Sequence, residues 1–191
     1  MSDERNVHPV EKPQKWDDYE LEKLFLFCIL DRAMSYEKVC AAFDQVMIYL
    51  WEGSMRGFEK HHVDKVAETL KSVGYRFPNQ TARHIKANSW VDAEWLSYCT
   101  REDMVKHCKG IGMKLASMFL VRTRHSHMAI IDVHIKRWLK DVHGLHVEGM
   151  KYEDMEGAFL ALAKHMGRDP EELDYEIWDQ YRIGNKKENK D

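Results

Sequence analysis

Apolar residues recur along this chain at the spacing of an α-helix, and this periodicity constrains the fold more than any other feature. The i, i+3, i+4, i+7 pattern is found in residues 21–29, 39–50, 63–70 and 155–166. Such spacing places the apolar side chains on one face of a helix, where they can be buried. No segment of useful length alternates apolar and polar residues, as a half-buried strand would. The sequence therefore predicts an all-α fold.

Glycine and proline residues mark where these helices are expected to begin and end. Gly74 stands where a helix C-cap belongs, and Pro78 suits the first turn of the helix that follows. Asp169 and Pro170 together predict the start of the last helix. Residues 53–57 are expected to separate the second helix from the third. These signals agree with the periodicity, so both favour helices joined by short connections.

The chain is long enough for one domain or for two small lobes that share an interface. It has 191 residues, of which 44% are hydrophobic and 11% aromatic, so a sizeable core can form. The first residues are polar and include Pro9 and Pro13, which favours a loose arm. We therefore expect an N-terminal arm (1–15), a helical domain (16–185) with a hairpin near 104–121, and a polar tail (186–191).

Charge is distributed unevenly along the sequence. The segment from Met104 to Lys140 contains eight basic residues and one acid, Asp132, which gives it a charge of +7. Because the net charge is −3, the rest of the chain carries −10. A basic segment on an acidic body is typical of a phosphate-binding surface. Solvated helix faces would have the same composition, so charge alone leaves both explanations open.

The cysteine content gives little support for a metal centre. The four cysteines are far apart and form no CxxC pair, so we expect buried free thiols in a reducing compartment and neither a metal ion nor a cofactor. The N-terminus is charged and lacks the apolar core of a signal peptide. No apolar run approaches the length needed to span a membrane. The sequence thus predicts an intracellular protein without a membrane partner.

The most informative segment is 104–119. A helix is expected to end near Cys108, followed by a tight turn at Gly110, Ile111 and Gly112 and a second helix from Met113. Glycine allows a sharp turn and the close approach of another backbone. The N–H groups of such a turn, at the start of a helix, point towards an anion such as a DNA phosphate. A bare GxG also suits an ordinary interhelical turn, but the hydrophobic middle residue and the basic neighbours favour a helix-hairpin-helix motif.

Two residues carry the expected chemistry. Lys114 lies in the first turn of the second helix, where the helix N-terminus and burial both disfavour the ammonium form and so favour a nucleophilic amine. Asp132 follows an apolar run and begins another helix, where aspartate is a favoured N-cap. A carboxylate held there can stabilise positive charge on a deoxyribose ring and shuttle protons that amine attack releases. Taken singly, a surface lysine and a helix cap would explain these residues equally well.

The segments from Lys109 to Lys114 and from Ile131 to His134 together resemble the helix-hairpin-helix GPD superfamily of DNA glycosylases. Within it, the chain is most similar to archaeal-type 8-oxoguanine DNA glycosylase/AP lyases. Residues 26–30, 74–79 and 173–178 support the resemblance, which extends in family order over roughly residues 20 to 185. It implies two helical lobes with the active site in the cleft between them, and a target nucleotide flipped out of double-stranded DNA.

The resemblance also implies residue roles. Lys114 would attack the sugar carbon and expel the base, and the resulting Schiff base would permit β-elimination of the strand. Asp132 would be the essential carboxylate. The expected DNA contacts are Lys109, Gly110, Ile111, Gly112, Tyr75, Arg76 and His134, and the expected base pocket contains Trp178, Phe27 and Met34. Trp178 would pack equally well in a core.

The substrate is less well defined than the chemistry. The family usually has small or amide residues after Leu30, whereas this chain has Asp31-Arg-Ala-Met34, and its tail continues to Asp191. Both departures concern recognition of the lesion. 8-oxoguanine is therefore the default, and another modified base, such as a hypermodified base of viral DNA, is the alternative. A non-catalytic helix-hairpin-helix DNA-binding module is the alternative of another class. The enzyme is expected to act on double-stranded DNA as a monomer associated with the nucleoid.

Overall fold

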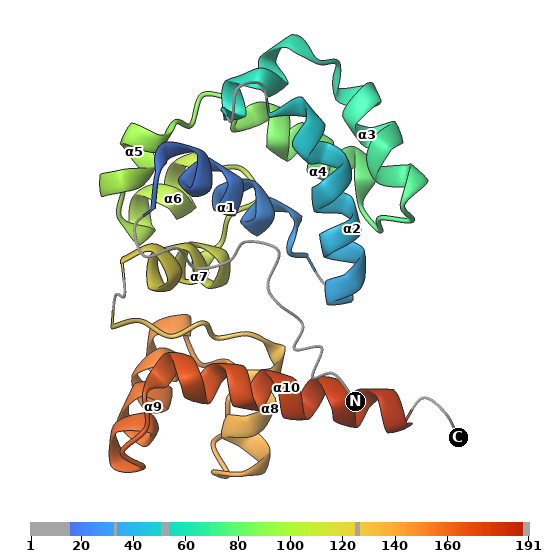
Figure 1. Ribbon diagram of the computed structural model, residues 1–191. Helices are drawn as coiled ribbons and strands as arrows, with labels where there is room; N and C mark the ends of the chain where they lie inside the picture. Colours follow the sequence, from blue (N-terminus) through green and yellow to red (C-terminus); the bar gives the residue numbers. More distant parts are fainter. Residues whose placement is uncertain (1–15, 33, 51–53, 125–126, 189–191) are drawn as a thin grey trace. The chain divides into compact units, whose positions relative to one another are not determined.

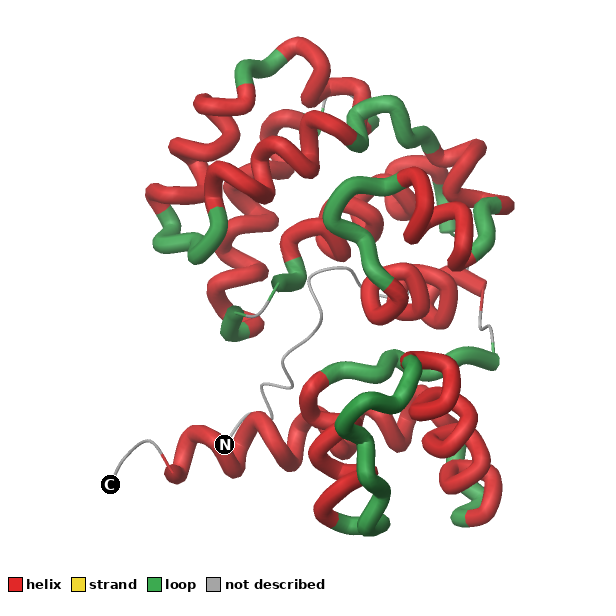
Figure 2. The backbone as a smooth tube through the Cα atoms, turned by 180° about the vertical axis from the view of Figure 1, so that it is seen from behind, coloured by secondary structure: helices red, strands yellow, loops and turns green. Residues whose placement is uncertain are grey.

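The computed structural model describes residues 16–32, 34–50, 54–124 and 127–188, with side chains as far as Tyr181. No strand occurs in these ranges, and every regular element is a helix (Figure 2), so the all-α prediction is confirmed. The chain forms two compact units, residues 1–119 and 120–191. The expected N-terminal arm lies outside the described residues. The last helix continues to Glu188 and so includes the first residues of the expected polar tail.

The first unit is built around its first helix, α1 (Asp18–Leu30). Every residue from Leu24 to Leu30 is buried, so this part of the helix is apolar on all sides and not only on one face. It contacts α2, α4 and α5, which surround it in Figure 1. The other elements of this unit are α2 (Tyr36–Val46), η1 (Met47–Tyr49), η2 (Met55–Lys60), α3 (Val63–Ser72), α4 (Pro78–Ala87), α5 (Ala93–Tyr98), α6 (Arg101–His107) and the first half of α7 (Met113–Arg124).

Local signals explain most helix ends in this unit. Gly74 has φ +68°, and the N–H groups of Gly74 and Tyr75 donate to the last turn of α3, as a glycine C-cap requires. Pro78 occupies the first turn of α4, as predicted. The second periodic segment becomes a 3₁₀ turn after Val46. The short elements η2 and α5 escaped prediction because six residues are too few to show a period.

A buried carboxylate joins three parts of the first unit. Glu22, on α1, accepts hydrogen bonds from the backbone N–H groups of Met55 at the start of η2 and of Ala93 at the start of α5. The second of these is 3.2 Å long. Burial raises the pKa of the Glu22 carboxyl, and the backbone hydrogen bonds oppose this shift. The contact provides acceptors for N–H groups that would otherwise be unsatisfied at two helix starts.

The second unit is a small three-helix core. Its helices are α8 (Val133–Asp141), α9 (Tyr152–His165) and α10 (Pro170–Glu188), and each contacts the other two. Trp138 and Phe159 meet at its centre, edge to face, with ring centroids 5.8 Å apart. Asp169 caps α10, since its side chain accepts from the N–H groups of Glu171 and Glu172, as predicted from Asp169-Pro170. None of the described helices is both long and apolar enough to cross a membrane.

Candidate active site

The predicted hairpin is present in the first unit. The helix α6 ends at His107 with Cys108 as its C-cap, and α7 begins at Met113, which confirms both expected ends. Gly110 has φ +82°, a conformation that costs other L-residues energy. A Cβ at this position would lie 2.3 Å from Nδ1 of His84. Gly110 is therefore required both by its backbone angle and by its neighbour.

Gly112 differs from Gly110. Its φ lies outside the left-handed region, and among the described residues no atom comes within 4 Å of the position that a Cβ would take. The described contacts of the chain therefore require glycine at Gly110 but not at Gly112. The neighbour that excludes a side chain at Gly110 is the His84 imidazole and not a second backbone. Any close approach at Gly112 would have to involve a group outside the described residues.

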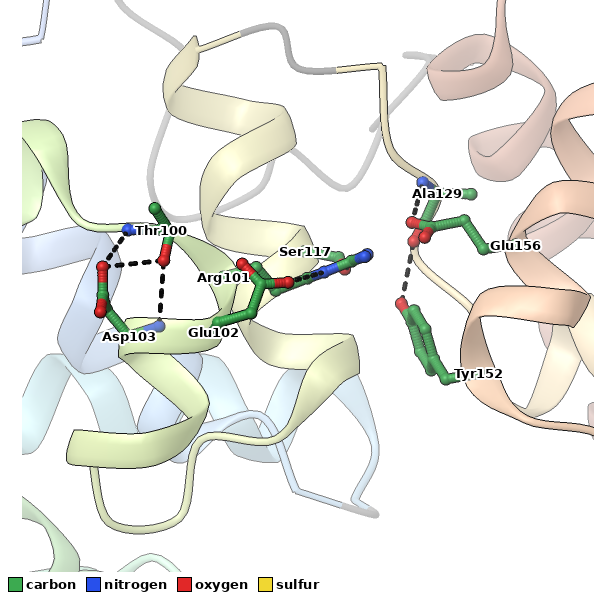
Figure 3. A network of polar contacts seen from close by, with 8 residues as sticks. All are labelled: Thr100, Arg101, Glu102, Asp103, Ser117, Ala129, Tyr152 and Glu156. Carbon is green, nitrogen blue, oxygen red and sulfur yellow. Dashed lines mark hydrogen bonds and ion pairs between the residues drawn. The ribbon is translucent and has the colours of Figure 1, made fainter.

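Buried side chains hold the hairpin rigidly. Asn88, at the end of α4, is fully buried and pairs with Lys109 twice: its Nδ2 donates to the Lys109 carbonyl and its Oδ1 accepts from the Lys109 N–H, each at 2.8 Å. Ile111 is 4% exposed and anchors the turn in the core, so a DNA contact at this residue stays a prediction for its backbone. Arg101, at the start of α6, donates to Ser117 of α7 at 3.2 Å (Figure 3). The Asn88 clamp was not predicted, because it joins residues that are distant in sequence.

Lys114 lies in the first turn of α7, as predicted, and its Nζ pairs with the Asp31 carboxylate. The two side chains are 32% and 25% exposed, so both are partly shielded from water. Sequence reasoning considered only influences that disfavour the ammonium, whereas an adjacent carboxylate favours it. Asp31 had been noted as a departure from the family and not as a partner of the lysine. The two residues are 83 positions apart, which is why the pairing was missed.

A group of basic side chains lies beside the hairpin. Arg32, next to Asp31, contacts Nδ1 of His84 at 3.0 Å through its guanidinium, so this nitrogen must be the acceptor. Burial lowers the pKa of the His84 imidazole, and the nearby charges of Arg32, Arg83 and Lys109 lower it further. Lys109 is exposed. This cluster presents positive charge next to the N–H groups of the turn, which suits a polyanion.

Asp132 lies in the second unit and begins α8, as predicted. Its Oδ1 accepts from the N–H groups of His134 and Ile135, at 2.7 and 2.9 Å. Among the described residues no hydrogen bond to Oδ2 is found, so one carboxylate oxygen caps the helix while the other is available to a ligand. The segment that precedes Asp132 is held by α9. Tyr152 donates to the Ala129 carbonyl, and Glu156 accepts from the Ala129 N–H (Figure 3).

Two residues expected at the DNA or in the base pocket are instead buried in the first unit. Phe27 is 2% exposed and packs edge to face on Phe43, with ring centroids 5.5 Å apart, so it belongs to the core. Tyr75 is 4% exposed, and its hydroxyl donates to the Leu30 carbonyl at 2.6 Å. Their large aromatic rings fill the interior around α1, a burial that the family resemblance did not indicate. Tyr75 supports the loop that carries Asp31.

The remaining predicted residues lie partly or fully at the surface of their own units. Arg76 is exposed, and its backbone N–H contacts the Met34 sulfur at 3.3 Å. Trp178 is partly buried on α10, with its ring 6.1 Å from that of Tyr175. His134 follows Asp132 in the first turn of α8. These positions permit the predicted contacts without testing them. No cluster of metal-binding side chains occurs in the described ranges.

The chain is similar to known base-excision enzymes over most of its length. A model of the 8-oxoguanine DNA glycosylase family matches residues 10–168. An 8-oxoguanine DNA glycosylase/AP lyase of Thermotoga petrophila is 32% identical over 135 residues, which cover 64% of this chain and 65% of that protein. One from Picrophilus torridus is 30% identical over 178 residues, covering 86% and 80%. The match thus spans just under two thirds of the length of the Thermotoga relatives.

Solved structures agree with the sequence comparison. The crystal structure of the 8-oxoguanine DNA glycosylase of Thermotoga maritima has a TM-score of 0.67 and 28% identity, and covers 84% of this chain and 78% of that one. The enzyme of Methanocaldococcus jannaschii in complex with DNA containing 8-oxoguanine shares the fold, with a TM-score of 0.73 over 94% of this chain and 87% of that one, at 24% identity. The hairpin, the helical fold and these matches lead to one conclusion: the chain belongs to the 8-oxoguanine DNA glycosylase family of helix-hairpin-helix proteins.

Proposed function

We propose that the protein is a DNA glycosylase with AP lyase activity that removes 8-oxoguanine from double-stranded DNA, using Lys114 as its nucleophile. The observation that carries the proposal is the position of Lys114, in the first turn of the helix that follows a rigid glycine hairpin. A family relative from Picrophilus torridus that matches 86% of this chain is an 8-oxoguanine DNA glycosylase/AP lyase. A DNA-binding scaffold would need the hairpin but not a lysine in this place.

The hairpin is suited to hold one DNA phosphate. Its N–H groups lie at the N-terminus of α7, where the helix dipole favours an anion, and Lys109 adds an exposed cation. The Asn88 clamp fixes the backbone of the turn before DNA arrives. A contact to phosphate carries no sequence information, so it positions the duplex while other residues recognise the base. Arg76 is the exposed cation we assign to the opened duplex, and Trp178 the aromatic side chain we assign to the flipped base.

The proposed reaction begins when the neutral Lys114 amine attacks C1′ of the flipped nucleotide. The Nζ–C1′ bond forms, and the base leaves with the electron pair of the glycosidic bond and takes a proton from water. Asp132 stabilises the positive charge that develops on the sugar, through the oxygen that does not cap α8. Ring opening then gives a Schiff base, and loss of a C2′ proton expels the 3′ phosphate by β-elimination. No metal ion takes part in this scheme.

The proposal can be tested by trapping the covalent intermediate. The protein is incubated with duplex DNA that contains either 8-oxoguanine or a ready-made abasic site, in the presence of borohydride, which reduces a Schiff base to a stable amine. We expect a trapped adduct with both substrates and none with Lys114→Gln. An adduct that survives this substitution would exclude Lys114 as the nucleophile, and binding without any adduct would favour a non-catalytic DNA-binding module.

The identity of the base requires a second experiment. The same duplex is prepared with 8-oxoguanine, with unmodified guanine and with hypermodified bases of the kind found in viral DNA, and the released base is identified by mass. We expect release of 8-oxoguanine and retention of guanine. Release of a hypermodified base, together with retention of 8-oxoguanine, would keep the lysine chemistry and replace the substrate. The sedimentation of the enzyme with and without DNA would test the expectation of a monomer.

A further inference from the structure

The loop after α1 binds the proposed nucleophile through an acid. Asp31 is the C-cap of α1, and its carboxylate pairs with the Lys114 Nζ across 83 positions of sequence. Both side chains are partly exposed, so solvent screens the pair and it contributes little to stability. Stability is therefore a weak reason for an acid at this position. Its contact with the one amine that the proposed reaction requires suggests a chemical reason.

The structure holds the Asp31 carboxylate in a fixed place. The Asp31 N–H donates to the Phe27 carbonyl at 3.0 Å, and the preceding carbonyl, of Leu30, accepts from the Tyr75 hydroxyl at 2.6 Å. The charged and titratable groups near Asp31 include Arg32 on the same loop, the Tyr75 phenol and, beyond Arg32, the His84 imidazole. The backbone on both sides of the carboxylate is thus fixed by neighbouring groups, so the acid does not depend on a flexible loop for its position.

Asp132 and Asp31, the two acids that the scheme concerns, have different hydrogen-bond partners. Asp132 uses Oδ1 to cap α8, in the second unit. Asp31 contacts the reacting nitrogen of Lys114 itself. An ammonium has no lone pair and cannot attack a sugar carbon, so it must first lose a proton to an acceptor within hydrogen-bond reach. Asp31 is an acceptor that lies in direct contact with the Lys114 Nζ.

We infer that Asp31 positions the Lys114 amine and takes its proton as it attacks the sugar. The Nζ–H bond breaks and an O–H bond forms on Asp31, which frees the lone pair that makes the Nζ–C1′ bond. Asp132 then acts on the charge of the sugar and Asp31 on the charge of the lysine. This inference rests on the proposed function, because it assigns a partner to the same nucleophile. It also gives the departure from small or amide residues after Leu30 a chemical purpose.

The test is the pH dependence of base release in a single turnover. In Asp31→Asn we expect release at about pH 7 to fall on the order of 100-fold. The deficit should close as pH rises towards about 9.5, because solvent then removes the proton that Asp31 would accept. Asp31→Glu should restore most of the rate and the flatter profile of the wild type. The matched control, Asp44→Asn, removes an exposed acid on α2 and should leave the profile unchanged.

The possible outcomes separate this inference from the proposed function. If the wild type forms no borohydride adduct with abasic DNA, the lysine mechanism itself fails. If it forms the adduct while Asp31→Asn releases base as fast as the wild type or faster at about pH 7, the ion pair only restrains the lysine and the inference is overturned. Melting temperatures show whether Asp31→Asn is misfolded, and in that case the test rests on Asp31→Glu. A rate and pH profile near those of the wild type in Asp31→Glu support the inference. Loss of activity in a folded Asp31→Glu protein contradicts it.

Discussion

Lys114 and Asp132, the proposed nucleophile and the carboxylate assigned to the sugar, are held in opposite ways. The Lys114 ammonium is paired with a side chain 83 positions earlier in the sequence, on a loop that only the folded first unit brings near it. The Asp132 carboxylate is held by backbone N–H groups two and three positions later, within its own helix. One residue thus depends on tertiary structure and the other on local structure.

At Asp132 the groups that serve function and stability are separate atoms, whereas at Lys114 one atom serves both. Asp132 divides the two tasks between its oxygens, so an amide at this position can cap α8 and still lack the charge that catalysis requires. Lys114 has a single nitrogen, which is both the atom in the ion pair and the proposed nucleophile. Substitutions at the two positions should therefore change base release and the free energy of unfolding in different proportions. Measuring both quantities is the strongest test of this difference between the two residues.

The largest effect is expected for Lys114→Gln. Removal of the amine should abolish the borohydride adduct and lower base release on the order of 1000-fold or more, because no other group in the scheme forms the covalent bond. The loss of one partly exposed ion pair should change the free energy of unfolding by no more than about 1 kcal/mol. Single-turnover release and urea unfolding measure the two quantities. A large loss of stability would show that Lys114 is mainly structural.

Asp132 is expected to give the next largest effect, and two substitutions divide its roles. Base release should fall about 100-fold to 10,000-fold in both Asp132→Asn and Asp132→Ala, since neither carries the negative charge. Only Asp132→Ala should destabilise the fold, by about 1 kcal/mol, because asparagine caps a helix nearly as well as aspartate. Equal stability losses in the two variants would contradict the assignment of Oδ1 to the cap.

The two hairpin glycines provide a smaller and purely structural contrast. Gly110→Ala should lower the free energy of unfolding by about 2 kcal/mol, because it forces a side chain into the left-handed region and against His84. Gly112→Ala should change it by less than about 0.5 kcal/mol, since nothing described lies near its Cβ position. If Gly112 approaches a phosphate, the same substitution should still raise the Kd for duplex DNA, by roughly tenfold. An unchanged Kd would remove Gly112 from the interface.

The features predicted correctly from the sequence are those that local physics determines. The ends of α6 and α7, the glycine cap at Gly74, the Asp132 N-cap and the start of α10 all follow from residues within one turn of the feature. Each depends on a backbone angle or a capping bond that a single residue type favours. For the same reason the all-α fold could be predicted from spacing alone.

The features missed or placed wrongly depend on contacts between distant residues. Asn88 clamps the hairpin and Asp31 binds Lys114, and each contact joins a polar residue to a partner at least 21 positions away. Phe27 was expected in a base pocket, but residues 24–30 of α1 are all buried, and Phe27 packs in the core with them. Amphipathic spacing shows which residues can be buried, but it does not show which helix is surrounded.

The smallest effect is expected for His84, which contacts both the hairpin and Arg32, the neighbour of Asp31. Its pH dependence therefore tests whether these tertiary contacts stabilise the fold. Its pKa is lowered from 6.5, first by burial and then by Arg32, so the folded protein resists a proton that the unfolded chain accepts. The stabilisation is fully present above about pH 6.5 and is lost as pH falls towards the lowered value. The stability advantage of the wild type over His84→Gln should therefore shrink between about pH 7.5 and about pH 5 in urea unfolding. Arg32→Gln should weaken this pH dependence without removing it, because burial is the larger cause of the lowered pKa. If the free energy of unfolding has the same pH slope in the wild type and in His84→Gln, the imidazole does not couple the hairpin to the loop.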